Sequence, residues 1–281
     1  MSKKKNLILL SVLLTLLCCA CGQYAVYSGK KESKSAENKT DKEISTQLPE
    51  LKIGTTIFAP YFYIGDDGEE TGVDVDIAKE ACKRMGYEPV FKQITWGEHD
   101  KLLEDRSVDC IWNCHSMNGR ENEYTWAGPY MYSKEGVIVS ADSNIWSLAD
   151  LEGKSIAVEV DSKAEDFFLK EDTVNVATVS TYAALEDAFT AFGKGYVDAV
   201  ADHEEALKDF TSKNEKLYRY IEPPIFTARL GVAFKKDSHK KIAAKLTNVL
   251  DEMNKDGTIA SIAKKYGLNK ENLLEVSADE K

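Results

Sequence analysis

The sequence of 281 residues lacks several features that would point to common protein classes. It has no excess of basic residues, because 36 Lys and Arg stand against 47 Asp and Glu, giving a formal net charge of -11. A chain this acidic, with no basic patch interleaved with aromatic residues, excludes nucleic acid as the partner. Motifs for phosphate cradles, dinucleotides, zinc proteases and serine hydrolases are also absent, so nothing indicates a cofactor.

Cysteine is scarce in the body of the chain. Three of the six cysteines lie within residues 18–21, which leaves Cys82, Cys110 and Cys114. An odd number excludes a fully paired disulfide framework, and whether one pair forms stays open. These thiols and His115 could also hold a metal, but they lack Cys-x-x-Cys spacing and straddle a predicted buried strand. We therefore expect no metal site.

No apolar run is long enough for a comfortable membrane span. Lys3–Lys5 precede the short apolar run Leu7–Leu17, in the order of a secretory leader. A small residue, a cysteine and a glycine follow and resemble a lipobox. We expect residues 1–20 to be a lipoprotein signal peptide and Cys21 to be acylated, holding the protein on the extracytoplasmic face of the cell membrane. An ordinary secretory signal or an uncleaved anchor is the alternative. Residues 21–50 are too polar to fold and predict a flexible tether.

Beyond the tether, short apolar runs alternate with amphipathic segments. This alternation predicts an α/β fold with parallel-rich sheets, and 43% hydrophobic residues suffice for two lobes. We expect strands at residues 51–57, 88–94, 108–112, 155–160, 174–179, 197–201 and 229–234. We expect helices at residues 77–85, 98–105, 164–170, 182–192, 204–211, 240–255 and 257–266.

The run Ser107–Tyr130 is the most informative stretch. Its apolar start is typical of a strand buried on both faces, and a polar loop ending at Arg120 follows. Ligands in open α/β sheets sit beyond the carboxyl ends of strands, so this loop is a candidate binding edge. The planar guanidinium of Arg120 suits a carboxylate, although an ordinary surface arginine is the alternative.

Three other predicted strands also have a possible ligand-binding residue at or just past their carboxyl ends, namely Phe58, Ser162 and Asp202. Arg120 with serine hydroxyls suits an α-carboxylate, whereas Asp202 suits an α-ammonium. A zwitterion placed between them would pair both charges. Phe58 and Trp96 offer apolar faces that could stack on a ligand, or they could be core residues. The expected ligand-binding residues are Phe58, Trp96, Asn113, Cys114, Ser116, Arg120, Ser162, Lys163 and Asp202.

Two of these residues have a local structural alternative. Asp202 with Glu205 three residues later forms a capping-box pattern, and local evidence alone favours the cap. Ser162 could likewise cap the helix that follows it. Both roles can coexist with ligand binding.

A family resemblance rests on several short motifs. The Gly-Pro-Tyr that ends the run Ser107–Tyr130, the segment Ala59–Phe62, Gly72–Asp76, the Asp-Leu-x-Gly-Lys of residues 150–154 and the closing segment 255–267 resemble the polar amino-acid solute-binding proteins of ABC importers, bacterial extracellular family 3. The resemblance implies a two-lobed periplasmic-binding-protein-like (type II) fold with two crossover strands. It implies the following division: lobe 1 at 51–139 and 229–267, lobe 2 at 140–228, and a tail at 268–281.

The resemblance also implies function. It favours ammonium binding over capping at Asp202, and a monomer that delivers a polar amino acid to an ABC permease. Where the family usually has Gly, this chain has Asp161, which must take a conformation that Gly accepts more easily. The alternative is an enzyme on the same scaffold, similar to cyclohexadienyl or arogenate dehydratases, with Glu159, Asp161 or His115 as the acid. Selectivity is left open, and five residues could line the pocket: Trp112, His115, Lys163, His203 and Arg229.

Overall fold

A computed structural model describes residues 47–170, 173–212 and 217–274. The expected signal peptide, the expected acylation site Cys21, most of the tether and residues 275–281 lie outside these ranges. Among the described residues, no helix is long and apolar enough to cross a membrane.

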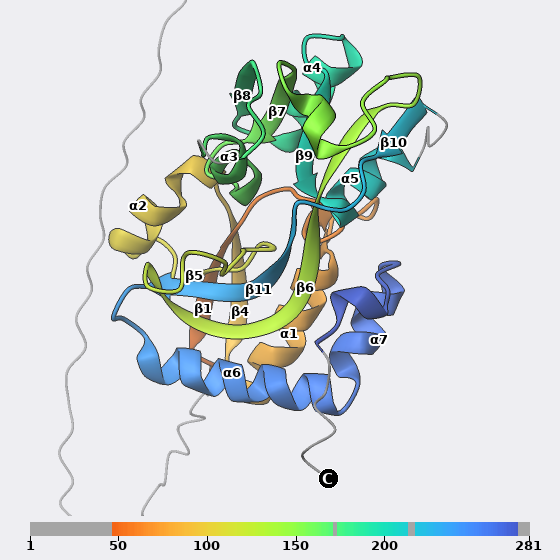
Figure 1. The fold of residues 1–281 in the computed structure, drawn as a ribbon. Helices are drawn as coiled ribbons and strands as arrows, with labels where there is room; N and C mark the ends of the chain where they lie inside the picture. Colours follow the sequence, from red (N-terminus) through yellow and green to blue (C-terminus); the bar gives the residue numbers. More distant parts are fainter. Residues whose placement is uncertain (1–46, 171–172, 213–216, 275–281) are drawn as a thin grey trace, which may run out of the picture. The chain divides into compact units, whose positions relative to one another are not determined.

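The described body alternates strands and helices, as Figure 1 shows. The strands are β1 (Glu50–Thr55), β2 (Tyr63–Ile64), β3 (Glu70–Thr71), β4 (Glu88–Gln93), β5 (Cys110–Ile111), β6 (Tyr124–Ser140), β7 (Ser155–Glu159), β8 (Thr178–Tyr182), β9 (Ala199–His203), β10 (Tyr218–Tyr220) and β11 (Phe226–Lys235). The helices are α1 (Val73–Met85), α2 (His99–Glu104), α3 (Lys163–Phe168), α4 (Leu185–Gly193), α5 (Glu204–Thr211), α6 (Lys240–Lys255) and α7 (Thr258–Lys265), with 3₁₀ turns at Trp96–Glu98, Leu148–Leu151 and Lys270–Asn272.

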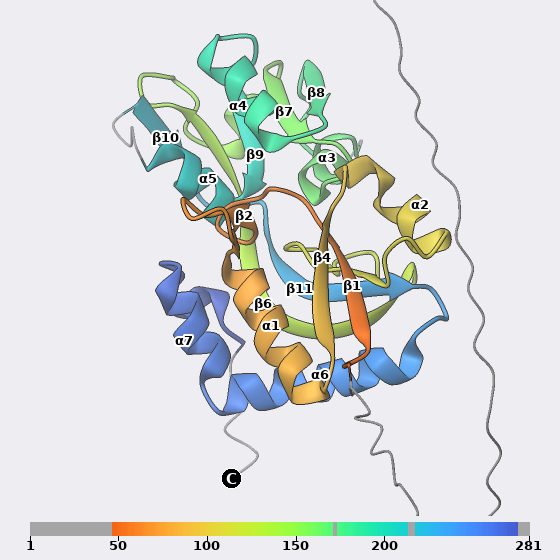
Figure 2. The same cartoon turned by 180° about the vertical axis from the view of Figure 1, so that it is seen from behind.

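The main sheet has two parallel groups joined by two antiparallel strands. Its order is β4-β1-β5-β11-β6-β9-β7-β8, with β10 beside β6. β1 pairs in parallel with β4 and β5, and β7 pairs in parallel with β8 and β9. Helices α1, α6 and α7 pack on the first half, and α3, α4 and α5 pack on the second (Figures 1 and 2). Short parallel strands covered by helices are the expected product of βα alternation.

β6 and β11 connect the two halves of the sheet. The sequence analysis did not predict a strand at β6. β6 pairs with β11 as far as Glu135 and with β9 from Glu135 to Val139. Near its start, Gly128 and Pro129 face an irregular step of the ladder around Gly231. A Gly-Pro pair argues against a central strand unless the ladder is irregular there, which explains why the pattern was missed.

Element boundaries differ most where non-local pairing decides them. β8 lies at Thr178–Tyr182, four residues later than expected, because it pairs in register with Ser155–Glu159. Residues 268–274 were expected to belong to a tail, yet Asn272 is buried and donates to the carbonyl oxygen of Tyr132 and to Glu205. By contrast, α5 and α6 span the residues that their amphipathic patterns predict.

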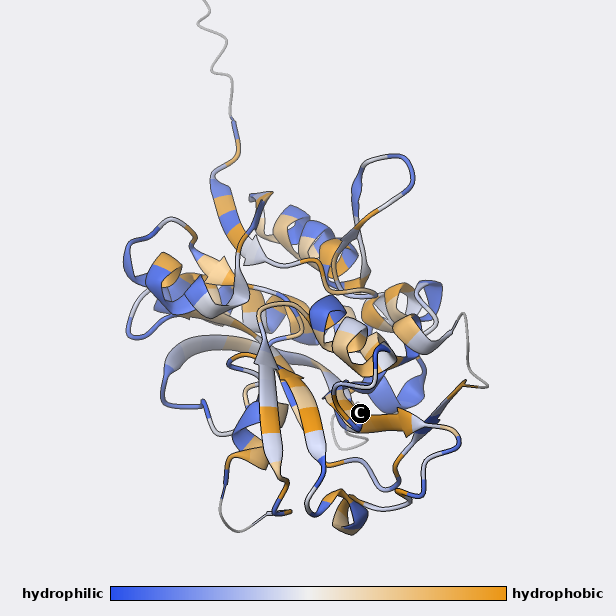
Figure 3. Ribbon diagram, turned by 90° about the horizontal axis from the view of Figure 1, so that it is seen from above, coloured by the Kyte–Doolittle hydropathy of each residue, from blue (hydrophilic) through white to orange (hydrophobic). Residues whose placement is uncertain are grey.

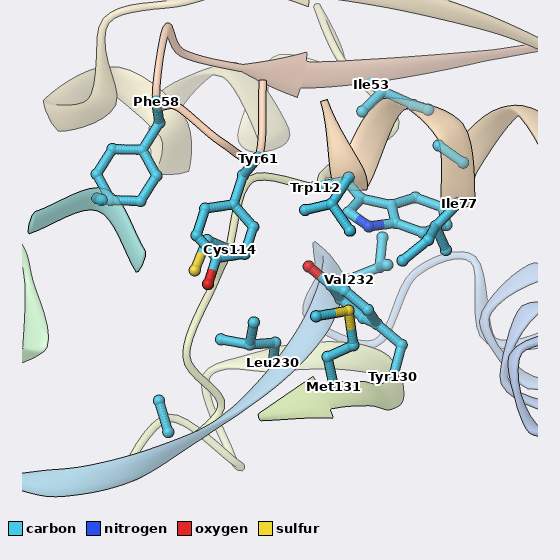
Figure 4. Packing of buried hydrophobic residues seen from close by; sticks show 14 of the residues in the cluster. Ile53, Phe58, Tyr61, Ile77, Trp112, Cys114, Tyr130, Met131, Leu230 and Val232 are labelled. Carbon is cyan, nitrogen blue, oxygen red and sulfur yellow. The ribbon is translucent and has the colours of Figure 1, made fainter. Parts of the chain in front are cut away.

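The core follows from these patterns. Figure 3 shows helices banded in blue and orange, as expected for elements with one polar and one apolar face. The largest buried side chain, Trp112, packs against Tyr130 with ring centroids 5.8 Å apart. Figure 4 shows Tyr61 and Cys114 facing each other at the end of this cluster nearest Phe58. The core therefore extends up to the strand ends.

Gly72 and Asp74 connect α1 to the loop after β5. Gly72 has a φ of 135°, and a Cβ there would lie 2.1 Å from the carbonyl oxygen of Tyr61, so only glycine fits. Asp74 is buried and accepts hydrogen bonds from the Cys114 N–H at 2.7 Å and the Tyr130 hydroxyl at 2.8 Å. Cys114 has a φ of 54°, so this contact stabilises a backbone conformation that is unusual for its residue type.

We predict that Asp74→Ala lowers the free energy of unfolding by about 2 kcal/mol, because two buried donors lose their acceptor. Asp76→Ala is the matched control on the same helix. Asp76 is 26% exposed and contacts Lys265 and Tyr266, so its loss should cost about 1 kcal/mol or less. Urea unfolding followed by tryptophan fluorescence measures both. Equal losses in the two variants would contradict the role given to Asp74.

Candidate functional site

One small cavity of about 30 Å³, partly open to solvent, lies where the strand ends of the two halves meet. All nine residues expected to bind a ligand line it. It is also lined by Glu135, Glu159 and His203. The sequence analysis named His203 as a possible pocket residue and Glu159 as a possible acid, and it missed Glu135. The structure thus brings together residues that lie up to 145 positions apart, from Phe58 to His203.

Arg120 lies on the loop after β5 and reaches the other half of the molecule. Its Nη2 donates to the carbonyl oxygen of Asp161 at 2.6 Å. Within the described part of the chain, no carboxylate forms an ion pair with Arg120, so most of its five N–H donors stay available. Asp161 has a φ of 56°, which confirms the conformation expected from the residue type usual at this position.

Ser116, Ser162 and Lys163 lie near Arg120 around the cavity. The Ser162 hydroxyl accepts from the Glu165 N–H at 3.0 Å, so the capping role is confirmed, and the residue also lines the cavity. The Lys163 ammonium forms an ion pair with Asp166 on the same helix. The cations of the cavity are therefore Arg120, free of carboxylates, and Lys163, already paired.

The Asn113–Cys114 backbone is fixed by its neighbours. The Asn113 side chain exchanges hydrogen bonds with Thr55 and Thr56 at 2.5 to 3.2 Å, so its amide is committed to the end of β1. The thiols of Cys82, Cys110 and Cys114 are free, and burial raises the pKa of each. They are inert side chains of the interior.

Asp202 is the least satisfied group in the cavity. It is buried at the end of β9, and its Oδ1 accepts from the His203 N–H at 2.7 Å. Its Oδ2 has no hydrogen-bond partner among the described residues. Burial, with the charge of Glu186 adding to it, raises the pKa of Asp202 to about 7. A buried, unpaired carboxylate oxygen is a place for a cation.

The capping role considered for Asp202 is wrong. Helix α5 begins at Glu204 with His203 at its N-cap, and no side chain caps it. Asp202 instead belongs to β9, where it pairs with Gly136 of β6. The strand pairing is non-local, so the local capping-box pattern could not reveal it.

Phe58 and Trp96 are cavity walls and core residues at the same time. They are 5% and 7% exposed. The Phe58 ring lies 5.8 Å from Tyr61 and edge-on to His203 at 6.1 Å, and Trp96 stacks on His99 at 4.7 Å. Rings held this way keep a fixed surface towards the cavity.

Three residues that could have lined the pocket do not. Trp112 is in the core, and Arg229 pairs with Glu121 on the surface. His115 is packed among aromatic rings, with no hydrogen-bond partner for either ring nitrogen in the described ranges, and burial lowers its pKa well below the ordinary value. His115 therefore provides no acid for chemistry in the cavity. Asp161, another candidate acid of the enzyme alternative, is exposed to solvent.

The class of protein follows from this arrangement: an α/β binding protein whose cavity is closed by strand ends from both halves. The chain belongs to the bacterial extracellular solute-binding proteins, family 3, whose pattern matches residues 51–269. It is therefore an extracytoplasmic binding protein of the periplasmic-binding-protein-like fold, and not an enzyme.

Known proteins of similar sequence cover nearly the whole chain. The Probable amino-acid-binding protein YxeM of Bacillus subtilis (strain 168) is 26% identical over 94% of this chain and 95% of its own length. The L-cystine-binding protein TcyA of the same organism is 27% identical over 94% and 97%. The crystal structure of Tv2483 bound to L-arginine matches with 30% identity and a TM-score of 0.73, over 81% of this chain and 94% of that one.

We predict that the ligand-free protein loses stability as the pH rises. The pKa of Asp202 is about 7 when folded against an ordinary 3.8, so the folded state holds a proton that the unfolded state releases between pH 4 and 7. Urea midpoints should therefore fall between pH 4 and pH 8, and Asp202→Asn should be more stable than wild type at pH 8 but not at pH 4. An identical pH profile in the variant would contradict the unpaired state of Asp202.

Proposed function

We propose that the protein binds a free polar α-amino acid in this cavity. The observation that carries the proposal is the pairing of Arg120, which has no carboxylate partner in the described structure, with the unpartnered Oδ2 of Asp202 across one cavity. A zwitterion supplies an anion to the half-buried Arg120 and a cation to the buried Asp202, so both charges are paired. The names of similar proteins, which bind arginine, cystine or histidine, support the same ligand class.

The two lobes close on the ligand by a hinge at the crossover strands in this proposal. Lobe 1 comprises residues 51–139 and 229–267, and lobe 2 comprises residues 140–228. Arg120 belongs to the first lobe and Asp202 to the second, so the ligand stabilises the state in which the lobes approach each other. The Arg120–Asp161 contact, which joins the same lobes, supports this arrangement.

The closed, loaded protein then delivers its ligand to the permease of an ABC importer, as a monomer.

Acylation of Cys21 would hold the protein on the extracytoplasmic face of the membrane, with residues 21–50 as a tether. The wild-type protein should incorporate a labelled fatty acid, and Cys21→Ala should not. A wild-type protein that takes up no label, or a variant that still takes it up, would overturn the lipid anchor.

We predict that Arg120→Ala and Asp202→Ala each weaken amino-acid binding by about 100-fold or more, since each leaves a ligand charge unpaired in a buried site. A thermal-shift screen of the twenty amino acids and cystine finds the ligand, and calorimetry measures its affinity. Circular dichroism confirms that each variant is folded.

Arg229→Ala is the matched control, because Arg229 is 42% exposed and pairs with Glu121 outside the cavity. Its affinity should equal that of the wild type. Wild-type affinity in Arg120→Ala or Asp202→Ala would remove that residue from the site.

A further inference from the structure

The cavity holds more carboxylates than a simple zwitterion can neutralise. Glu135, Glu159 and Asp202 all line it and are all buried. A zwitterion brings one ammonium, which pairs with one carboxylate. Its carboxylate takes Arg120, and Lys163 is already paired with Asp166. Negative charge therefore remains at one end of the site.

Once the α-ammonium pairs with Asp202, Glu159 is the cavity carboxylate that still needs a partner. It ends β7, which pairs with β9 in parallel, and continuing the register of Ala157 with Val200 by two residues sets Glu159 opposite Asp202. Opposite residues in a sheet project from the same face, and like charges placed there repel. No donor from the described residues contacts the Glu159 carboxyl in a hydrogen bond. Burial and the charge of Asp202 raise its pKa well above the ordinary value.

Glu135 differs, because His203 faces it and the proton positions can be traced. Glu205 accepts from Ser133 at 2.6 Å, and also from Tyr61 and Asn272. The Ser133 proton is thus used, so its oxygen accepts from His203 Nδ1–H at 3.0 Å. In the neutral ring, His203 Nε2 then carries a lone pair that faces Glu135 Oε1 at 3.3 Å.

His203 is neutral because burial lowers its pKa to about 4. A proton shared between Nε2 and Oε1 would hold these two atoms at this distance. Burial, with the charge of Asp202 adding to it, raises the pKa of Glu135 well above its ordinary value, and His203 faces its Oε1. Glu135 is then satisfied by the protein itself, and Glu159 is not.

We propose that Glu159 is the binding partner of a second cationic group on the ligand, so that the protein selects a basic amino acid. The proposal rests on the function proposed above. The α-carboxylate binds Arg120, the α-ammonium binds Asp202, and the side-chain ammonium or guanidinium binds Glu159. The face of Phe58, which lines the same cavity, suits the stem and plane of such a side chain.

The test compares L-arginine with L-citrulline, which has the same length and shape but a neutral ureido group. Calorimetry at pH 7.5 should show arginine binding about 10-fold to 100-fold more tightly, the value of a hydrogen bond to a charged group. Glu159→Gln should weaken arginine by about 10-fold or more and leave citrulline within about 3-fold. The variant should therefore lose most of the discrimination while it keeps amino-acid binding.

Glu186→Gln is the matched control. Glu186 is an exposed carboxylate on α4 that raises the pKa of Asp202 and lies outside this cavity. If only general negative charge mattered, this variant would act like Glu159→Gln. We expect both ligands to change by less than about 3-fold, since an exposed charge is screened by solvent.

The number of protons released on ligand binding distinguishes a direct contact at Glu159 from a purely structural effect of its substitution. A cation beside Glu159 and Asp202 favours their ionised forms, so arginine binding near pH 6.5 should release protons, and fewer in Glu159→Gln. Calorimetry in buffers of different ionisation enthalpy measures the number. The charges that act on Glu159 are those of Glu135 on β6, Glu186 on α4 and Asp202 on β9. Arg120 on the loop after β5, Lys163 on α3 and His203 on β9 line the same cavity.

Three results would overturn the proposal, and they are distinguishable. Equal affinity for arginine and citrulline would remove the second cationic subsite and leave the amino-acid function standing. Failure of every amino acid to bind would overturn both. Tight binding of Zn²⁺ or Mn²⁺ alone, lost in Glu135→Gln and kept in Glu159→Gln, would show that the cluster of Glu135, Asp202 and His203 takes a metal ion instead.

Discussion

The arrangement of this site depends on a buried carboxylate that the described residues leave without a cation. Asp202 sits at the carboxyl end of β9, between β6 and β7, where the sheet leaves it little water and one hydrogen bond. Such a group costs stability, and proteins keep it only where something else later compensates. The crossover strands β6 and β11 make this possible, because they set the ends of two parallel groups face to face around a single cavity.

The sequence was most informative where a pattern is local. α5 and α6 begin and end at the residues expected for them. In α6 one apolar stripe of Ala243, Leu246, Val249, Leu250 and Met253 is buried. The candidate site could also be predicted from the rule that strand ends carry ligands, and all nine expected residues line one cavity. Whether they bind a ligand stays a prediction. Asp161 shows that a residue where glycine is usual marks a left-handed backbone, here with a φ of 56°.

Non-local pairing explains what the sequence could not reveal. Glu135 lies within β6, which was not predicted as a strand because of its Gly-Pro pair. The local sequence pattern therefore gave no sign that the Glu135 side chain lines the cavity. The sequence at Asp202 matches a capping box, but Asp202 pairs with Gly136 and is therefore part of strand β9. Trp112 had seemed a possible pocket residue, and only the packing of Tyr130 against it shows that it is core.

Charge balance connects the fold to selectivity. With Glu135 facing His203 and Lys163 paired with Asp166, the cavity groups left for a ligand are Arg120, Asp202 and Glu159. A neutral amino acid satisfies the first two and leaves Glu159 either unpaired or protonated, which costs affinity above the pH at which it ionises. A ligand with one anionic and two cationic groups satisfies all three at once. Discrimination then comes from the carboxylate that a wrong ligand leaves uncompensated, which is a stronger filter than the shape of the cavity alone.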